Sequence, residues 1–160
     1  MSARKRSTQS PRIVNRRARH DFHILETVEV GLALRGCEVK SLRQGQASLA
    51  GSFARIDDGE VFLYGMYIAP YQEGSYNNPP PRRPRKLLLH RRQIDQLTTK
   101  VSGTGCTLVP LRLYFKRGLA KVELALARGK RQYDKREAIK KREAEREMRR
   151  AAKRGPDRPV

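Results

Sequence analysis

The chain has 160 residues, of which 36 are Lys or Arg and 16 are Asp or Glu, so its net charge is +20. A field of this sign attracts a polyanion. The many Arg side chains favour RNA over a membrane surface, because guanidinium groups grip phosphates bidentately and stack on bases. No apolar segment reaches the length of a membrane-spanning helix, so we expect no membrane partner.

The basic residues concentrate at the two ends of the chain. We expect residues 1–14 to form a flexible basic arm, residues 15–127 one folded domain, and residues 128–160 a basic tail. Cys37 and Cys106 belong to no CxxC motif and have no clustered His partners, which argues against a zinc site. The sequence also has no apolar secretory segment near Met1. We therefore expect both cysteines to be reduced thiols in a cytoplasmic protein, with an isolated disulfide as the alternative.

Apolar side chains alternate from residue 22 to residue 34, and only Glu26 breaks the pattern. A period of two predicts a β-strand. Glu26 and Gly31 indicate a bulge or a sharp bend, so the segment forms either one strand or two. A short helix is expected over residues 37–45, with two side chains facing the core, Val39 and Leu42.

The turn Asp57-Asp58-Gly59 lies between two short alternating segments, residues 52–56 and 60–64. Because glycine tolerates positive φ, this pattern predicts a β-hairpin. A short strand is expected over residues 66–69. The five prolines and two adjacent asparagines of residues 70–84 then predict a long exposed loop.

A helix with Ile94, Leu97 and Val101 on one stripe is expected next. Residues 108–115 and 119–126 predict a second hairpin, in which two sets of side chains should face each other: Val109, Leu111, Leu113 and Phe115 against Val122, Leu124 and Leu126. The predicted fold class is therefore mainly β (α+β), a small antiparallel OB-like β-barrel with short flanking helices and a basic tail. An open two-layer sheet is the alternative.

Residues 128–154 contain 13 Lys or Arg and 5 acidic residues, with Ile139 and Met148 as the only large aliphatic side chains. So little apolar surface cannot offset the entropy of ordering a free segment. The i, i+4 pairs Glu137–Lys141 and Glu145–Arg149 nevertheless favour a helix. We expect a tail that is frayed alone and helical when bound; a solvated charged helix without a partner is the alternative.

No pattern in the sequence is typical of an active site, because the histidines are scattered and no nucleophile elbow or phosphate-binding loop occurs. We predict no enzyme activity, no cofactor and no metal. The segment PRRPRKLLLH (residues 81–90) instead brings guanidinium groups within reach of RNA phosphates, with a solvated loop as the alternative. Tyr76 and Tyr133 are the tyrosines expected to be most exposed for base stacking.

Six segments follow one another along the chain: NRRARHDF (15–22), ETVEVGLAL (26–34), EVKSLRQG (38–45), PRRPRKLLLH (81–90), VPLRLYF (109–115) and ARGKRQYDKR (127–136). Together they closely resemble the SmpB family, the bacterial SsrA-binding proteins. The resemblance implies an OB-like barrel that binds transfer-messenger RNA (tmRNA, or SsrA RNA) at the D-loop region of its tRNA-like domain. It also implies that the tail enters the decoding centre of a stalled ribosome during trans-translation and becomes helical in the empty message channel.

The resemblance further implies the partners of the chain. These are tmRNA, the ribosomal RNA of the small subunit and, indirectly through the charged RNA, EF-Tu, with the chain monomeric on the RNA. The alternative function is that of a general ribosome-associated or single-strand RNA-binding barrel without a dedicated RNA, and an RNA-modifying enzyme comes third.

Within these segments the resemblance assigns Glu29, Leu88 and His90 to RNA binding. A carboxylate is unexpected there on charge grounds, but it can accept from a base-edge amine or orient a neighbouring Arg. With the basic residues of the same segments, the full set expected to bind RNA is Asn15, Arg16, Arg17, Arg19, His20, Glu29, Lys40, Arg43, Arg82, Arg83, Arg85, Lys86, Leu88 and His90. The tail residues expected at the decoding centre are Gly129, Lys130, Arg131, Tyr133, Asp134, Lys135 and Arg136.

Overall fold

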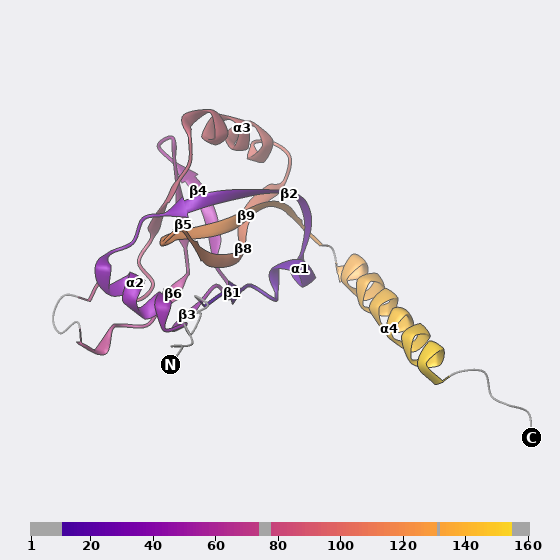
Figure 1. The fold of residues 1–160 in the computed structure, drawn as a ribbon. Helices are drawn as coiled ribbons and strands as arrows, with labels where there is room; N and C mark the ends of the chain where they lie inside the picture. The colour runs from indigo at the N-terminus through magenta and orange to yellow at the C-terminus, as the bar shows by residue number, and fades with distance from the viewer. Residues whose placement is uncertain (1–10, 74–77, 131, 155–160) are drawn as a thin grey trace, which may run out of the picture. The chain divides into compact units, whose positions relative to one another are not determined.

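The computed structural model describes residues 11–73, 78–130 and 132–154, with the side chains of residues 132–135 and 154 excepted (Figure 1). The predictions for residues 1–10, for Tyr76 and for Arg131 lie outside these residues. The chain divides into two compact units, Met1–Gly129 and Lys130–Val160, and each is described by itself.

The first unit is built from short helices and antiparallel strands. Its elements are, in chain order, β1 (Ile13–Val14), α1 (Ala18–Asp21), β2 (Phe22–Leu32), α2 (Gly36–Arg43), β3 (Ala47–Ser48), β4 (Phe53–Asp57), β5 (Glu60–Tyr64), β6 (Tyr67–Ile68), β7 (Arg85–Leu88), α3 (Arg91–Val101), β8 (Cys106–Lys116) and β9 (Leu119–Gly129). The strands follow the order β8-β4-β5-β7-β2-β9, and β9 pairs again with β8, which closes the ring. The prediction of a closed barrel rather than an open sheet is confirmed.

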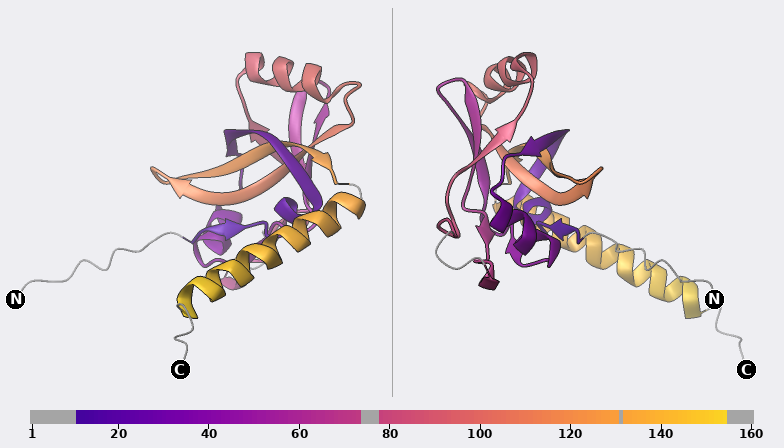
Figure 2. Two further views of the ribbon diagram at one scale, coloured as in Figure 1. Left: turned by 90° about the vertical axis from the view of Figure 1, so that its right-hand side faces the viewer. Right: turned by 60° about the vertical axis from the view of Figure 1, so that its left-hand side comes forward.

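The core of the barrel lies inside this ring and is closed at both ends by helices. Figures 1 and 2 show α3 at one end and α2 at the opposite end. Ile94 and Leu97 of α3 and Leu42 of α2 are buried in the same apolar cluster as the inward side chains of the strands. The predicted stripe of α3 is therefore confirmed. In α2, Leu42 is buried as predicted, but Val39 is only half-buried, and Glu38 takes the inward position.

β2 is one continuous strand with an irregularity where the alternation of the sequence breaks. Its register against β9 shifts between Ile24 and Glu26, so the predicted bulge is confirmed. Gly31 does not bend the strand, because it stays in register with Lys121 on one side and Leu88 on the other. The glycine instead allows close approach of β7: a Cβ at this position would lie 3.2 Å from the Cβ of Leu88.

Both predicted hairpins are present, but the second carries a bulge that the sequence pattern did not reveal. The β4–β5 turn places Asp58 at φ 50° and Gly59 at φ 75°, as a two-residue hairpin requires. In β8 the register shifts between Pro110 and Arg112. The shift reverses which side chains point inward, so Val109 and Leu111 pack in a second small cluster with Ala18, Ala125 and Ala127. The prediction that they face Val122, Leu124 and Leu126 is wrong.

The sequence pattern predicts no strand within residues 81–90, yet the segment Arg85–Leu88 is a strand inserted between β5 and β2. The loop before it is less exposed than predicted in its described part, because Pro79 is buried. Asn78 fixes this part by accepting from the Tyr71 N–H at 3.0 Å and donating to the Tyr71 carbonyl at 2.9 Å.

The second unit contains α4 (Gln132–Arg154), a helix of 23 residues. The structure differs here from the frayed free tail that the sequence predicts. Helix α4 is longer than the roughly 12–15 residues below which isolated helices are marginal, and its Ala residues and i, i+4 pairs of opposite charge stabilise it further. Ile139 and Met148 are 41% and 71% exposed, so this helix carries little that could pack in a core. Among the described residues, no helix is long and apolar enough to cross a bilayer.

Candidate nucleic-acid interface

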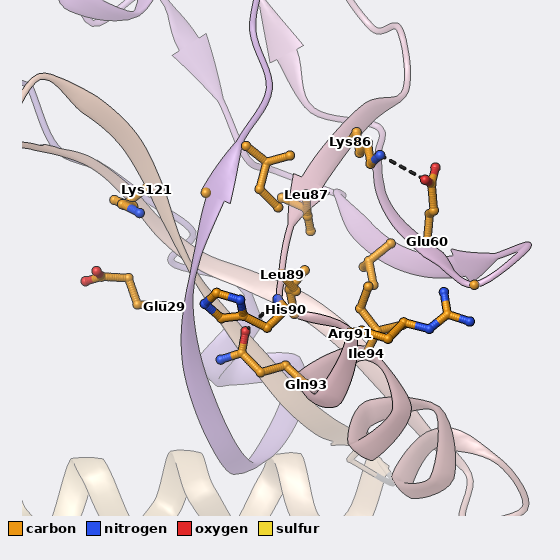
Figure 3. Close-up of a pocket in the computed structure, with 14 residues that line it drawn as sticks. Glu29, Glu60, Lys86, Leu87, Leu89, His90, Arg91, Gln93, Ile94 and Lys121 are labelled. Carbon is orange, nitrogen blue, oxygen red and sulfur yellow. Dashed lines mark hydrogen bonds and ion pairs between the residues drawn. The ribbon is translucent and has the colours of Figure 1, made fainter.

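A groove of about 500 Å³ lies where β2, β7 and the start of α3 meet. Glu29, Leu88 and His90 all line it, although Glu29 is about sixty positions away from the other two in the sequence. Figure 3 shows Glu29 and Lys121 on one side of β2 and Glu60, Lys86 and Arg91 on the other. The barrel therefore brings three residues assigned by resemblance into one concave surface.

Glu29 is held as a charged acceptor at the rim of this groove. The Tyr114 hydroxyl donates to one carboxylate oxygen, and the Lys116 ammonium lies 3.4 Å from the other. The hydrogen bond from Tyr114, followed by the interaction with Lys116, holds the pKa of Glu29 below its ordinary value. Burial and the bond to Glu29 raise the pKa of Tyr114 to about 12, so the phenol keeps its proton at neutral pH. Among the residues that the structure describes, no Arg hydrogen-bonds to Glu29. The arrangement therefore favours acceptance from a base-edge amine over orientation of a neighbouring Arg.

Leu88 presents an apolar side chain to solvent inside the groove. It is 52% exposed although it belongs to a strand, because β7 alternates and its inward positions are taken by Arg85 and Leu87. Its side chain lies against Gly31, where a larger residue would push it away. An exposed leucine beside hydrogen-bonding groups is suited to the flat face of a base or a ribose.

His90 is fixed at the first turn of α3. It is the residue that caps the N-terminus of the helix, and its backbone N–H donates to the Gln93 side-chain carbonyl at 3.1 Å. This half of a capping box orients both residues toward the groove. His90 is exposed, so its ring is available to stack on a base or to hydrogen-bond with it.

The groove also contains basic residues, some of which the sequence reasoning missed. Lys86 was predicted, and it is paired with Glu60 at 2.9 Å. Lys121 and Arg91 were not predicted, yet both line the groove. The register places Lys121 directly opposite Gly31, so the alternation of β9 could have indicated it once its pairing with β2 was known.

Two arginines of the predicted phosphate-binding strip, Arg83 and Arg85, bind the buried Glu38 carboxylate instead of facing solvent freely. Arg85 is 0% exposed. Its Nε donates to Glu38 Oε2 at 2.5 Å, Nη1 donates to the Met66 carbonyl at 2.8 Å, and Nη2 donates to the Pro81 carbonyl at 3.0 Å. Arg83 binds the other oxygen of Glu38. Arg85 therefore cannot reach a phosphate, because its donors are used inside the barrel.

Glu38 completes this cluster and was missed, since acidic side chains in a basic protein are ordinarily placed at the surface. It is 3% exposed, and it also accepts from the Arg35 backbone N–H at 3.1 Å. Burial alone raises the pKa of Glu38, but the hydrogen bonds from Arg83, Arg35 and Arg85 outweigh burial and lower it. The carboxylate is thus charged at neutral pH.

The other predicted RNA-binding residues lie outside the groove. Asn15 is only 7% exposed and donates to the Pro110 carbonyl at 3.0 Å, so it braces the bulge of β8. His20 lies 2.9 Å from Asp21. The exposed basic residues are Arg16, Arg17 and Arg19 around α1, Lys40 and Arg43 on α2, and Arg82 before β7.

Aromatic rings lie beneath several of these cations. Lys40 lies over Tyr71 at 5.3 Å, Arg43 over Phe115 at 5.2 Å, and Arg82 over Tyr67 at 5.4 Å from the ring centroid. Stacking holds the long side chains in place while their charges stay in solvent. These positions suit phosphate contact better than base contact.

The tail residues lie at or after the end of β9. Gly129 ends the strand and pairs with Phe22, and Lys130 is half-buried. Arg136 is exposed on α4. The side chains of Tyr133, Asp134 and Lys135 lie outside the described part of the chain. Asp134 is the third residue of α4, in the first turn, where a negative charge stabilises a helix.

Among the described residues, no cluster of three or more His, Cys, Asp or Glu could hold a metal ion. The family model of SmpB protein matches residues 12–154. The chain belongs to the SmpB family. The resemblance seen in its six segments is thereby confirmed.

Relatives within the SmpB family match nearly the whole chain. The SsrA-binding protein of Thermobifida fusca is 59% identical over 148 residues, covering 91% of this chain and 92% of the relative. That of Acidothermus cellulolyticus is 61% identical over 137 residues, with 86% of both chains covered. A solved structure of tmRNA-SmpB, concerned with the center of the bacterial ribosome, is 58% identical with a TM-score of 0.65. The match covers 81% of this chain and 94% of the solved chain.

Proposed function

We propose that this chain is a non-catalytic adaptor that binds tmRNA and delivers it to stalled ribosomes for trans-translation in the cytoplasm. The observation that carries the proposal is the groove at β2, β7 and α3, which gathers Glu29, Leu88 and His90 from separate segments. The relatives named SsrA-binding protein, and the solved structure of tmRNA-SmpB, support the choice of RNA.

In this proposal the barrel and the tail have different roles. The groove reads the tRNA-like domain through Glu29, Leu88 and His90, with Lys86, Arg91 and Lys121 close enough to neutralise its phosphates. The exposed cations outside the groove add contacts to the RNA backbone. Asn15 and Arg85, which were also expected from the sequence to bind RNA, are buried and make no such contact. The helical tail meets ribosomal RNA through its basic side chains.

Replacing Glu29 by Gln is expected to weaken binding to the tRNA-like domain by at least about fivefold, because a lost charged hydrogen bond to a base edge costs roughly 1–3 kcal/mol. The matched control is Glu26→Gln on the same strand. Glu26 is an exposed carboxylate paired with Lys100 at 2.6 Å, and the substitution changes the net charge equally. Filter binding of both variants at one salt concentration checks the prediction. Equal affinities for the two variants would remove Glu29 from the site.

His90→Ala should also weaken binding to the tRNA-like domain, since a ring that stacks on a base contributes about 1–3 kcal/mol. The variant should fold, because His90 is exposed and the hydrogen bond to Gln93 is donated by its backbone N–H. Circular dichroism checks this. Wild-type affinity in a folded His90→Ala protein would show that the ring faces no RNA.

Neutralising Arg82 should lower the log–log salt slope of tmRNA binding by about one unit, the value for one phosphate contact. Arg82 is exposed, and its Nη1 donates to the Gly65 carbonyl at 3.2 Å. Arg85→Gln is the informative comparison, because its side chain is buried and its loss should reduce stability instead. An unchanged slope in Arg82→Gln would mean that Arg82 faces solvent and contacts no phosphate.

A further inference from the structure

A cluster of aromatic and basic side chains lies on the outer face of the β4–β5 hairpin, away from the residues of the first groove. Phe53 and Tyr64 are opposite each other in register. Their ring centroids are 5.6 Å apart and their planes differ by 18°, so the rings are stacked. The Arg55 guanidinium lies 4.8 Å from the centroid of Tyr64. We call these three side chains the hairpin stack.

The hairpin stack is held in place before any ligand arrives. The Asp57 carboxylate accepts from Arg55 Nε at 3.0 Å and also from the Tyr64 hydroxyl. The bond from Tyr64, then those from Arg55, hold the pKa of Asp57 below its ordinary value, so the carboxylate keeps both donors at neutral pH. A binding surface ordered in advance loses little entropy on association.

One side of the hairpin stack opens into a second groove. Phe53 is 42% exposed, and β4 pairs with β8 at Ala54–Leu108, leaving a space of about 370 Å³ beside α3. Phe53, Ile56 and Val101 supply apolar lining, and Thr98, Ser102 and Thr107 supply hydroxyl groups. Flat apolar walls with a few hydrogen-bonding groups suit a nucleobase, whose face is apolar and whose edge is polar.

Charge favours RNA over an apolar peptide as the occupant. Arg55 is 61% exposed and adds a cation to the stack. Arg128 reaches the same end of α3, where its Nη2 donates to the Thr104 carbonyl at 3.5 Å. The net charge of +20 draws an RNA strand toward any such surface.

We propose that the exposed face of Phe53 stacks an unpaired base of an RNA strand, whose edge meets the hydroxyl groups of the second groove. This site is independent of the one that reads the tRNA-like domain, because the residues lining the two grooves do not overlap. The chain would then hold a folded RNA at one end of α3 and a single strand at the other.

The first test measures affinity for an eight-nucleotide oligoadenylate at physiological salt. Phe53→Leu keeps an apolar side chain but removes the stacking face, and it should weaken binding at least about fivefold, since stacking is worth about 1–3 kcal/mol per base. The matched control is Leu119→Ala, which trims a side chain that is 62% exposed in the β8–β9 hairpin. An abasic octamer with the same phosphates should bind both variants and the wild type equally.

The second test uses Phe53→Trp, which preserves the stack and introduces the single tryptophan of the chain, because the natural sequence has none. Oligoadenylate should quench its fluorescence, and the abasic octamer should not. His90→Ala should leave oligoadenylate binding unchanged while it weakens binding to the tRNA-like domain, so the two sites fail separately. Wild-type affinity in Phe53→Leu, or no base-dependent quenching in Phe53→Trp, would overturn the proposal and leave a protein partner for this surface.

Discussion

A chain that ends at Gly129 is expected to bind the tRNA-like domain of tmRNA nearly as well as the full chain, but to support no peptide tagging. The cut removes all of α4 and leaves the barrel intact, because the apolar core is formed by residues before it. It must not fall after Leu126. Ala127, Arg128 and Gly129 pair with Ile24, His23 and Phe22, and Ala127 is buried.

A smaller change should reproduce this separation of binding from tagging. Replacing Asp134, Lys135 and Arg136 together by Ala should leave tmRNA affinity intact and abolish tagging on a message without a stop codon. The triple change removes two cations that we propose meet ribosomal RNA phosphates, and a carboxylate in the first helical turn, where a negative charge stabilises a helix.

The matched control scrambles residues 130–150 at constant composition, which preserves the charge of the tail but not the order of its residues. If the tail contributed only nonspecific charge, the scrambled chain would tag as well as the wild type. The account predicts instead that tagging in a reconstituted system is lost in the scrambled chain, as in the triple variant.

Replacing Glu38 by Gln is expected to lower the free energy of unfolding by roughly 3 kcal/mol, because it leaves the buried Arg85 guanidinium without its counter-charge. Urea unfolding at pH 7 measures the loss. The control, Glu26→Gln, breaks an exposed pair and should cost less than about 1 kcal/mol. Equal costs would mean that the buried cluster does not stabilise the barrel.

The stability conferred by Glu38 should also depend on pH in a defined direction. Its pKa is lowered in the folded chain, so its contribution is complete above the ordinary carboxyl value of 4.5 and is lost as the pH falls through the folded value. The difference in unfolding free energy between wild type and Glu38→Gln should therefore shrink below about pH 4.5. A difference that stays constant into acid would contradict the assigned charge state.

The sequence alone predicted the hairpins and helices wherever local periodicity decides the structure. The Asp58-Gly59 turn has positive φ at both residues, which the glycine in the sequence indicated. Ile94 and Leu97 face the core because their helical spacing places both on one side of α3, and that spacing can be read from the sequence. The prediction failed where one residue changes the register: the bulge before Arg112 reverses the inward side of β8. Pro110 is the one local signal for it, because proline inside a strand occurs mainly at edges and bulges.

The candidate site was predicted only in part, because burial decides the role of a charged residue and burial is a property of the fold. Arg82 and Arg85 are three positions apart in one basic strip, yet one is exposed and the other fully buried against Glu38. Lys121 lines the groove through the pairing of β9 with β2. The resemblance assigned Glu29, Leu88 and His90, whereas their shared groove required the structure.

The most direct test of the account compares two folded RNAs at one salt concentration. Filter binding of the full chain to the tRNA-like domain of tmRNA and to bulk tRNA holds the nonspecific charge attraction nearly constant, because both present similar phosphate densities. The account predicts a clear preference for the tRNA-like domain, and loss of that preference in Glu29→Gln but not in Glu26→Gln. Equal affinity of the wild-type chain for both RNAs would contradict it, since a barrel that binds by charge alone needs no groove to read its RNA.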